Sequence, residues 1–157
     1  MSESREYPSR PFVGVGVVVF KDDSVLLIRR GKPPRAGEWS LPGGSQHTGE
    51  TVRETAAREV REETGVEIGE PQFLEVIDAI IPDDRGQTRF HYTLIDFWAE
   101  WRGGDPVADD DAAHAEWIDL AALEELEIWE KTREFIRTAE QRRRLHGAGS
   151  LPFYPDP

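Results

Sequence analysis

The chain has 157 residues, of which 31 are acidic and 19 basic, so its net charge is −12. A field of that sign repels nucleic-acid polymers and anionic membrane surfaces, and neither is an expected partner. The absence of cysteine excludes disulfides and thiolate metal sites, and the polar first residues do not resemble a signal peptide. We therefore expect a cytoplasmic protein.

The first part of the chain predicts two strands, a long loop and a helix. Residues 12–20 are rich in valine and punctuated by glycine, and residues 25–30 form a second apolar run after a polar turn. Residues 31–50 are rich in glycine and proline, which favours a loop. Residues 51–64 have a helical pattern that ends at Gly65, a residue suited to a helix C-terminus.

The second part predicts further strands and one long helical stretch. Residues 71–81 and 89–101 are expected strands joined by a turn, and a short strand is expected near residues 115–118. The stretch from about 119 to 144 is mostly helical in pattern. Strands and helices do not alternate strictly, so we expect an α/β fold in which helices pack on a mixed β-sheet.

The length favours a single domain, because no linker, repeat or low-complexity segment interrupts the chain. We place this domain at residues 11–144, with residues 1–10 and 145–157 as terminal extensions.

The predicted helix over 51–64 carries three glutamates within five residues. On a helical wheel its apolar stripe consists of Val52, Ala56 and Val60. Glu63 falls inside that stripe, Glu59 beside it and Glu62 on its flank. A carboxylate on a buried stripe needs a partner, and carboxylates at i and i+4 suit a hard divalent cation. The alternative is a solvated acidic face interspersed with arginines.

The loop before the helix strengthens the metal interpretation. Gly43 and Gly44 let the backbone approach a ligand closely, and a carbonyl there is a potential metal ligand. A tight turn is the alternative.

Residues 44–66 resemble the Nudix box, GX5EX7REUXEEXGU with U aliphatic, at every fixed position. The likeness also includes the segments 39–42 and 116–118, so it extends over about residues 11–140. The resemblance implies the Nudix α/β/α sandwich. It also implies hydrolysis of a nucleoside diphosphate linked to another moiety.

The resemblance further implies roles for individual residues. Glu59 and Glu63 are the expected ligands of Mg²⁺, or of Mn²⁺, with Glu62 and the Gly44 carbonyl as further ligands. Glu50 and Arg58 are expected to brace the loop against the helix. We include Glu50, Arg58 and Glu62 in the catalytic set.

The position of the general base is open in this family. Asp110, Asp111 and Glu116 are candidates on a later loop, and Asp111 completes our catalytic set; an exposed acidic turn is the alternative. One departure is His47, which stands where many relatives carry glutamate. It either alters a metal site or is a surface histidine.

Two positions bear on the substrate. Pro82 lies 16 residues after Val66, as in many relatives that hydrolyse ADP-ribose, whereas Asp83 replaces the tyrosine that is common in the dinucleoside-polyphosphate group. The upstream motif of the coenzyme A group is also not matched. We therefore expect ADP-ribose, or a related NDP-sugar.

Four residues are candidates for substrate binding. Trp39 and Tyr92 are suited to base stacking, and Arg30 and Arg35 to phosphate oxygens. Core packing is the alternative for the aromatic residues.

Two other functions stay open. One is a MutT-like (d)NTP pyrophosphohydrolase, and the other a non-catalytic nucleotide-binding regulatory module, against which the retained glutamates argue. A homodimer is a further expectation that the sequence does not decide.

Overall fold

The computed structural model describes residues 4–31, 36–107 and 112–147. The elements in chain order are β1 (Phe12–Lys21), β2 (Ser24–Arg30), β3 (Trp39–Ser40), β4 (Gly43–Ser45), α1 (Val52–Thr64), β5 (Glu67–Ile68), β6 (Gln72–Pro82), β7 (Thr88–Gly103), β8 (Ala112–Asp119), the 3₁₀ helix η1 (Leu120–Glu125) and α2 (Glu130–Gly147).

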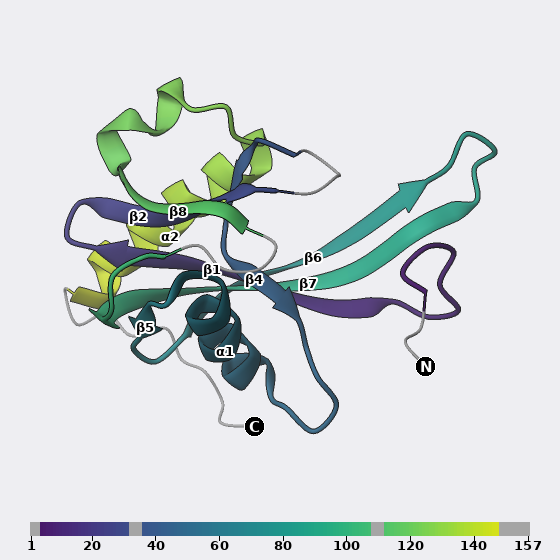
Figure 1. Cartoon of the computed structure of the whole chain (residues 1–157), viewed down its shortest axis with the longest axis horizontal. Helices are drawn as coiled ribbons and strands as arrows, with labels where there is room; N and C mark the ends of the chain where they lie inside the picture. Colours follow the sequence, from purple (N-terminus) through teal and green to yellow (C-terminus); the bar gives the residue numbers. More distant parts are fainter. Residues whose placement is uncertain (1–3, 32–35, 108–111, 148–157) are drawn as a thin grey trace.

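β1 is the central strand of a mixed sheet (Figure 1). It pairs in parallel with β7, and antiparallel with β2 and β4 along its other edge. β2 also pairs with β3 and β8, while β7 also pairs with β5 and β6. The parallel β1–β7 pair places the start of the chain beside residues that follow some eighty positions later.

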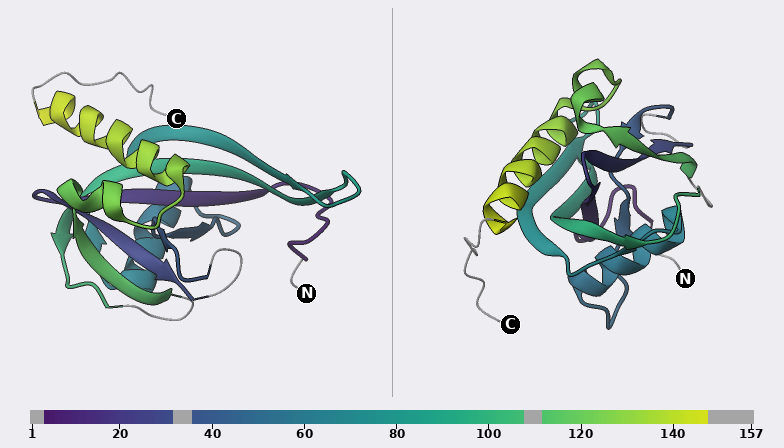
Figure 2. Two further views of the ribbon diagram at one scale, coloured as in Figure 1. Left: turned by 90° about the horizontal axis from the view of Figure 1, so that it is seen from above. Right: turned by 90° about the vertical axis from the view of Figure 1, so that its left-hand side faces the viewer.

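The two helices cover opposite faces of the sheet, as Figure 2 shows. Alternation along β1 explains this, because successive side chains of a strand point to opposite faces. Val15, Val17 and Val19 pack with Ala56 and Val60 of α1. Val18 and Phe20 belong to the core on the other face, together with Phe135, Ile136 and Ala139 of α2. The predicted α/β/α arrangement with a mixed sheet is therefore confirmed.

Three local predictions needed correction. The predicted loop over 31–50 contains the short strands β3 and β4. The predicted helical stretch over 119–144 is broken between η1 and α2, because Leu126 is extended and Ile128 forms a backbone bridge with Trp39. The two-residue strand β5 was not predicted at all.

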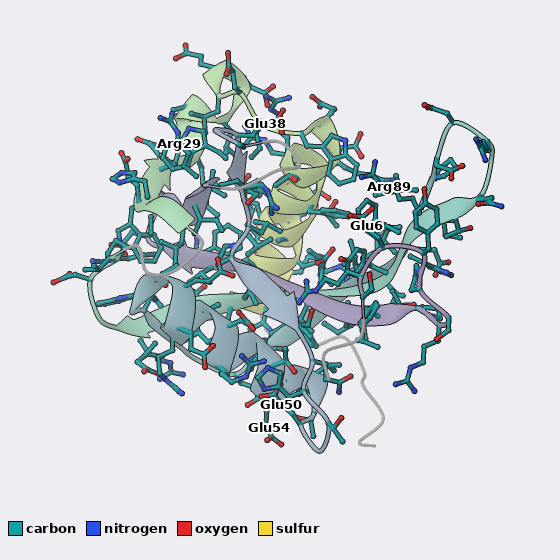
Figure 3. The ribbon with its side chains drawn as sticks, turned by 45° about the vertical axis from the view of Figure 1, so that its right-hand side comes forward. Glu6, Arg29, Glu38, Glu50, Glu54 and Arg89 are labelled. Atoms are coloured by element: carbon teal, nitrogen blue, oxygen red, sulfur yellow. The ribbon has the colours of Figure 1, made fainter. Side chains whose placement is uncertain are left out.

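β6 and β7 form a long hairpin that projects beyond the body of the domain (Figure 1). The N-terminal segment folds against the end of this hairpin: the Tyr7 amide donates to the Arg89 carbonyl at 2.7 Å, and Arg89 pairs with Glu6. Figure 3 shows the Glu6 and Arg89 side chains on this arm.

No helix within the described ranges is long and apolar enough to cross a membrane.

Candidate functional site

The acidic helix α1 is fixed at both ends by local signals in the sequence. The Thr51 side chain caps the N-terminus by accepting the Glu54 amide at 3.1 Å, which satisfies one of the amides that a helix start leaves free. At the other end Gly65 has φ 76°, a left-handed conformation that glycine adopts readily. The predicted end of the helix is thereby confirmed. Figure 3 shows Glu50 and Glu54 at the start of α1.

Arg58 is the centre of the site. Its guanidinium donates to both oxygens of Glu50, at 2.6 and 3.0 Å, to Glu59 Oε1 at 2.8 Å and to Glu62 Oε2 at 3.0 Å. It also donates to the Ser45 carbonyl at 2.9 Å. The Arg58 guanidinium therefore joins three carboxylates of the loop and helix to the backbone of β4. Hydrogen bonds to Glu50, despite partial burial, raise the pKa of Arg58 above its usual value.

Glu50 ties the loop to the helix from the other side. Its Oε1 accepts the Thr55 hydroxyl at 2.7 Å and the His47 amide at 3.1 Å, in addition to Arg58. These hydrogen bonds, led by those from Arg58, lower the pKa of Glu50 to about 2. Glu50 and Arg58 lie together as a brace between loop and helix, which is the arrangement that we expected for them. Their catalytic role stays a prediction.

The two expected metal ligands lie against the two glycines of β4. A Cβ atom placed on Gly44 would lie 2.3 Å from the Glu59 carboxyl carbon, so only glycine leaves room for that carboxylate. Glu63 Oε1 accepts the Gly43 amide at 3.2 Å. Because Gly43 and Gly44 are consecutive, the structure brings the Glu59 and Glu63 carboxylates to one stretch of backbone.

The donor set fits a hard divalent cation in chemistry, since it consists of oxygen atoms. Because Gly44 has no Cβ atom, the Glu59 carboxylate lies directly against the backbone of β4. Among the described residues, however, no three histidine, aspartate or glutamate side chains converge as a metal-binding group. Glu62 bonds to Arg58 and its side chain is 56% exposed. Glu59 and Glu63 lie against the β4 glycines, whereas Glu62 shares the Arg58 guanidinium with Glu59 at a more exposed position; the metal-binding role of all three stays a prediction.

The predicted substrate-binding residues have different settings. Trp39 is only 8% exposed and packs in the core, with the Arg29 guanidinium 4.8 Å from its ring centre and the His114 ring at 5.9 Å. Tyr92 is partly buried on β7 and packs near Phe12. Arg30 is partly buried at the end of β2, where its amide donates to the Glu38 carbonyl at 2.9 Å.

The remaining candidates are only partly described. Asp110, Asp111 and Arg35 lie outside the described residues. Glu116 is on β8, with a half-exposed side chain 2.8 Å from the His114 ring nitrogen. His47 is exposed, and its backbone rather than its ring connects it to Glu50.

The sequence-based interpretation did not consider Asp96 of β7. Its side chain is buried, and burial together with the nearby charge of Glu75 raises its pKa to about 7. The available signal was one acid in the middle of the apolar segment TLIDFWA.

Comparison with known proteins agrees with this fold. Residues 10–139 match the NUDIX domain family model. An ADP-ribose pyrophosphatase from Methanocaldococcus jannaschii is 40% identical over 74% of this chain and 66% of its own length. A putative 8-oxo-dGTP diphosphatase 2 from Mycobacterium tuberculosis is 34% identical over 87% of this chain and 92% of its own.

The fold comparison gives the same family. The crystal structure of a MutT NUDIX hydrolase from Burkholderia pseudomallei superposes with a TM-score of 0.70 at 29% identity, covering 83% of this chain and 98% of the other. The chain spans about two thirds of the length of the first curated relatives that it matches. With a family match over most of its residues, the chain belongs to the Nudix (NUDIX domain) family.

Proposed function

We propose that the chain hydrolyses the pyrophosphate linkage of a nucleoside diphosphate derivative, with ADP-ribose as the leading substrate and AMP and ribose 5-phosphate as products. The observation that carries the proposal is the set of carboxylates held by Arg58, Gly43 and Gly44. The relative named as an ADP-ribose pyrophosphatase supports this substrate, as does Pro82 after the box.

A bound Mg²⁺ or Mn²⁺ would neutralise phosphate charge and lower the pKa of an attacking water. Glu59 and Glu63 are the residues that would hold it, with the Gly44 carbonyl. Arg58 and Glu50 keep the loop and helix in register, so that both carboxylates stay beside the β4 glycines. A carboxylate outside the Arg58 network, such as Glu116 or Asp111, is the candidate that takes the proton from water.

A second candidate is hydrolysis of a nucleoside triphosphate. The relative from Mycobacterium tuberculosis supports it, because the likeness covers 92% of that protein. The same carboxylates would serve both reactions, so only the substrate profile separates them. Retention of Glu59, Glu62 and Glu63 disfavours a regulatory module without turnover.

The test is turnover by the purified chain on ADP-ribose, other NDP-sugars, dinucleotides and (d)NTPs, with Mg²⁺ and with EDTA. The variant is Glu63→Gln, and the control is Glu70→Gln, an exposed acid outside the box. Metal-dependent cleavage led by ADP-ribose, lost only in Glu63→Gln, is the expected result. A preference for triphosphates would make a nucleoside triphosphate, and not ADP-ribose, the substrate. An absence of turnover on every compound would overturn the proposal.

A further inference from the structure

Thr55 lies on α1 at a position that the pattern of the Nudix box leaves open. It is one of the seven unconstrained residues between Glu50 and Arg58. Its side chain is nevertheless fully buried, and a buried hydroxyl is unfavourable unless it is hydrogen-bonded. The pattern of the box therefore gives Thr55 no role, whereas its burial requires a hydrogen-bond partner.

The Thr55 hydroxyl has a single proton to donate and two acceptors within reach. Glu50 Oε1 lies at 2.7 Å and the Thr51 carbonyl at 3.0 Å. The Thr51 carbonyl already accepts the Thr55 amide at 2.9 Å. Glu50 is ionised at neutral pH, and hydrogen bonds to an ionised acceptor are shorter and stronger than those to a neutral one. The hydroxyl proton is therefore donated to Glu50.

The Arg58 guanidinium has no donor left over. Its Nε and Nη2 groups donate to the two oxygens of Glu50, and Nη2 also donates to the Ser45 carbonyl. Its Nη1 group donates to Glu59 and to Glu62. Five hydrogen bonds are the full number that a guanidinium can donate. The position of this one group is therefore tied to all of its partners at once.

The planar guanidinium links the orientation of Glu50 to that of Glu59. Because the fork is rigid, its Nε edge on Glu50 and its Nη1 corner on Glu59 move together. A rotation of the Glu50 carboxylate would turn the plane of Arg58 and carry Nη1 away from Glu59. Besides Arg58, the Thr55 hydroxyl and the His47 amide, at 3.1 Å, hold the Glu50 carboxylate.

Thr55 is suited to orient Glu50 because its own place is fixed. The next residue, Ala56, is fully buried and packs with Val60 in the core between α1 and the sheet. The β-branched side chain of threonine also has few rotamers in a helix. The hydroxyl is therefore a fixed donor on the helix, and the Glu50 carboxylate at the end of the loop is oriented against it.

We propose that Thr55 is a positioning residue for the metal-binding carboxylates. Its hydroxyl fixes the orientation of Glu50, Glu50 fixes the plane of Arg58, and Arg58 holds Glu59 where that carboxylate lies against Gly44. The inference rests on the function proposed above, because it takes Glu59 as a ligand of a divalent cation. Thr55 acts through Glu50 and not by contact with the cation.

Two substitutions of Thr55 separate positioning from packing. Thr55→Val keeps the branched shape and removes the hydroxyl, whereas Thr55→Ser keeps the hydroxyl and removes a buried methyl group. A threonine with only a structural role would lower stability in both variants and metal affinity in neither. The matched control is Thr64→Val, which removes a buried hydroxyl of the same helix that donates to the Val60 carbonyl at 2.6 Å.

The first measurement uses the metal-free protein and follows the exchange of the Arg58 Nε–H with water by ¹⁵N NMR. This group donates to Glu50 at 2.6 Å, so it should exchange slowly in the wild type and in Thr55→Ser. In Thr55→Val we expect exchange to be about fivefold faster, since one hydrogen bond that holds Glu50 is lost. Thr64→Val should behave as the wild type.

The second measurement is the affinity for Mn²⁺ alone, obtained from the EPR signal of free Mn²⁺ in the absence of substrate. Loss of a group that orients a metal ligand directly weakens binding roughly 10- to 100-fold. Thr55 is one step more distant, so we expect Thr55→Val to bind Mn²⁺ about fivefold more weakly. Thr55→Ser should unfold at a lower temperature than the wild type, yet it and Thr64→Val should keep Mn²⁺ affinity within about twofold.

Thr55→Ala removes the same hydroxyl in a residue that favours a helix, and it should repeat the result if Thr55→Val does not fold. The inference is overturned if removal of the hydroxyl leaves Mn²⁺ affinity unchanged, or if Thr64→Val weakens Mn²⁺ binding as much as Thr55→Val. Absence of Mn²⁺ binding by the wild type would overturn the proposed function and this inference with it. The two failures are therefore distinguishable.

Discussion

The domain holds acids in two contrasting ways on the two faces of one sheet. On the α1 face Glu50, Glu59 and Glu62 all accept hydrogen bonds from Arg58, which holds them close together. On the α2 face Asp96 is buried beside a glycine and another acid, so its ionised form is disfavoured. The same functional group therefore lies beside an arginine on one face, whereas on the other face burial disfavours its ionised form.

The largest expected effect concerns Asp96 on the α2 face, and it is a change in the free energy of unfolding with pH. Asp96 has a folded-state pKa of about 7, above its ordinary value of 3.8, so the folded state binds more protons between these pH values. The stability that this pKa shift contributes is fully present below about pH 4 and is lost as the pH rises towards 7. Asp96→Asn should be more stable than wild type at pH 8, by at most about 4 kcal/mol, and similar near pH 4.

Urea unfolding at several pH values measures this difference. The control Asp78→Asn should show no comparable gain at pH 8, since its side chain is exposed. Equal stability of wild type and Asp96→Asn at pH 8 would mean that the folded protein accommodates the charge, and the contrast between the two faces would disappear.

The next largest effect is expected from disturbing the carboxylates on the α1 face. Gly44→Ala places a methyl group 2.3 Å from the Glu59 carboxyl carbon, which forces that carboxylate or β4 to move. Displacement of a catalytic group by about 1 Å costs about a hundredfold in rate, so we expect a loss of that order in metal-dependent turnover.

The matched control is Gly103→Ala, because a Cβ there meets nothing within 4 Å and its φ is not in the left-handed range. It should retain full activity. Unchanged turnover in Gly44→Ala would show that the Glu59 carboxylate does not need its place against β4.

The sequence allowed much of the α1 side to be predicted but little of the α2 side. The end of the helix at Gly65 and the placement of Glu59 and Glu63 follow from the pattern of one short segment, and the Glu50–Arg58 brace was expected from the resemblance of that segment to the Nudix box. Asp96 depends on a strand register between residues eighty positions apart, and only the fold reveals Gly16 beneath it. Trp39 was expected to stack on a base but is buried in the core beside Ile128, a residue far along the chain, and that contact is visible only in the fold.

A smaller effect tests whether Arg58 is what allows the acids to stay together. Arg58→Met keeps the length of the side chain but removes its hydrogen bonds to Glu50, Glu59 and Glu62. We expect a loss of about 2 kcal/mol in the free energy of unfolding, because the partly buried carboxylates lose their shared cation.

Thermal and urea unfolding at pH 7 measure this loss, with Arg61→Met as the control. Arg61 pairs with Glu67 where both side chains are about half exposed, and an ion pair of that kind contributes little. Equal losses in the two variants would contradict the central role of Arg58.

The smallest effect refines the network around Glu50. Thr55→Val removes the buried hydroxyl that donates to Glu50 at 2.7 Å, and should destabilise the fold by about 1 kcal/mol. Thr64→Val, on the same helix, removes a buried hydroxyl that bonds to the Val60 carbonyl instead. Combined with Glu50→Gln, Thr55→Val should show a coupling energy whereas Thr64→Val should not, because only Thr55 shares a hydrogen bond with Glu50. Equal coupling for both threonines would show that the Thr55 hydroxyl does not contribute to holding Glu50, and would leave Arg58 and the His47 amide as its partners.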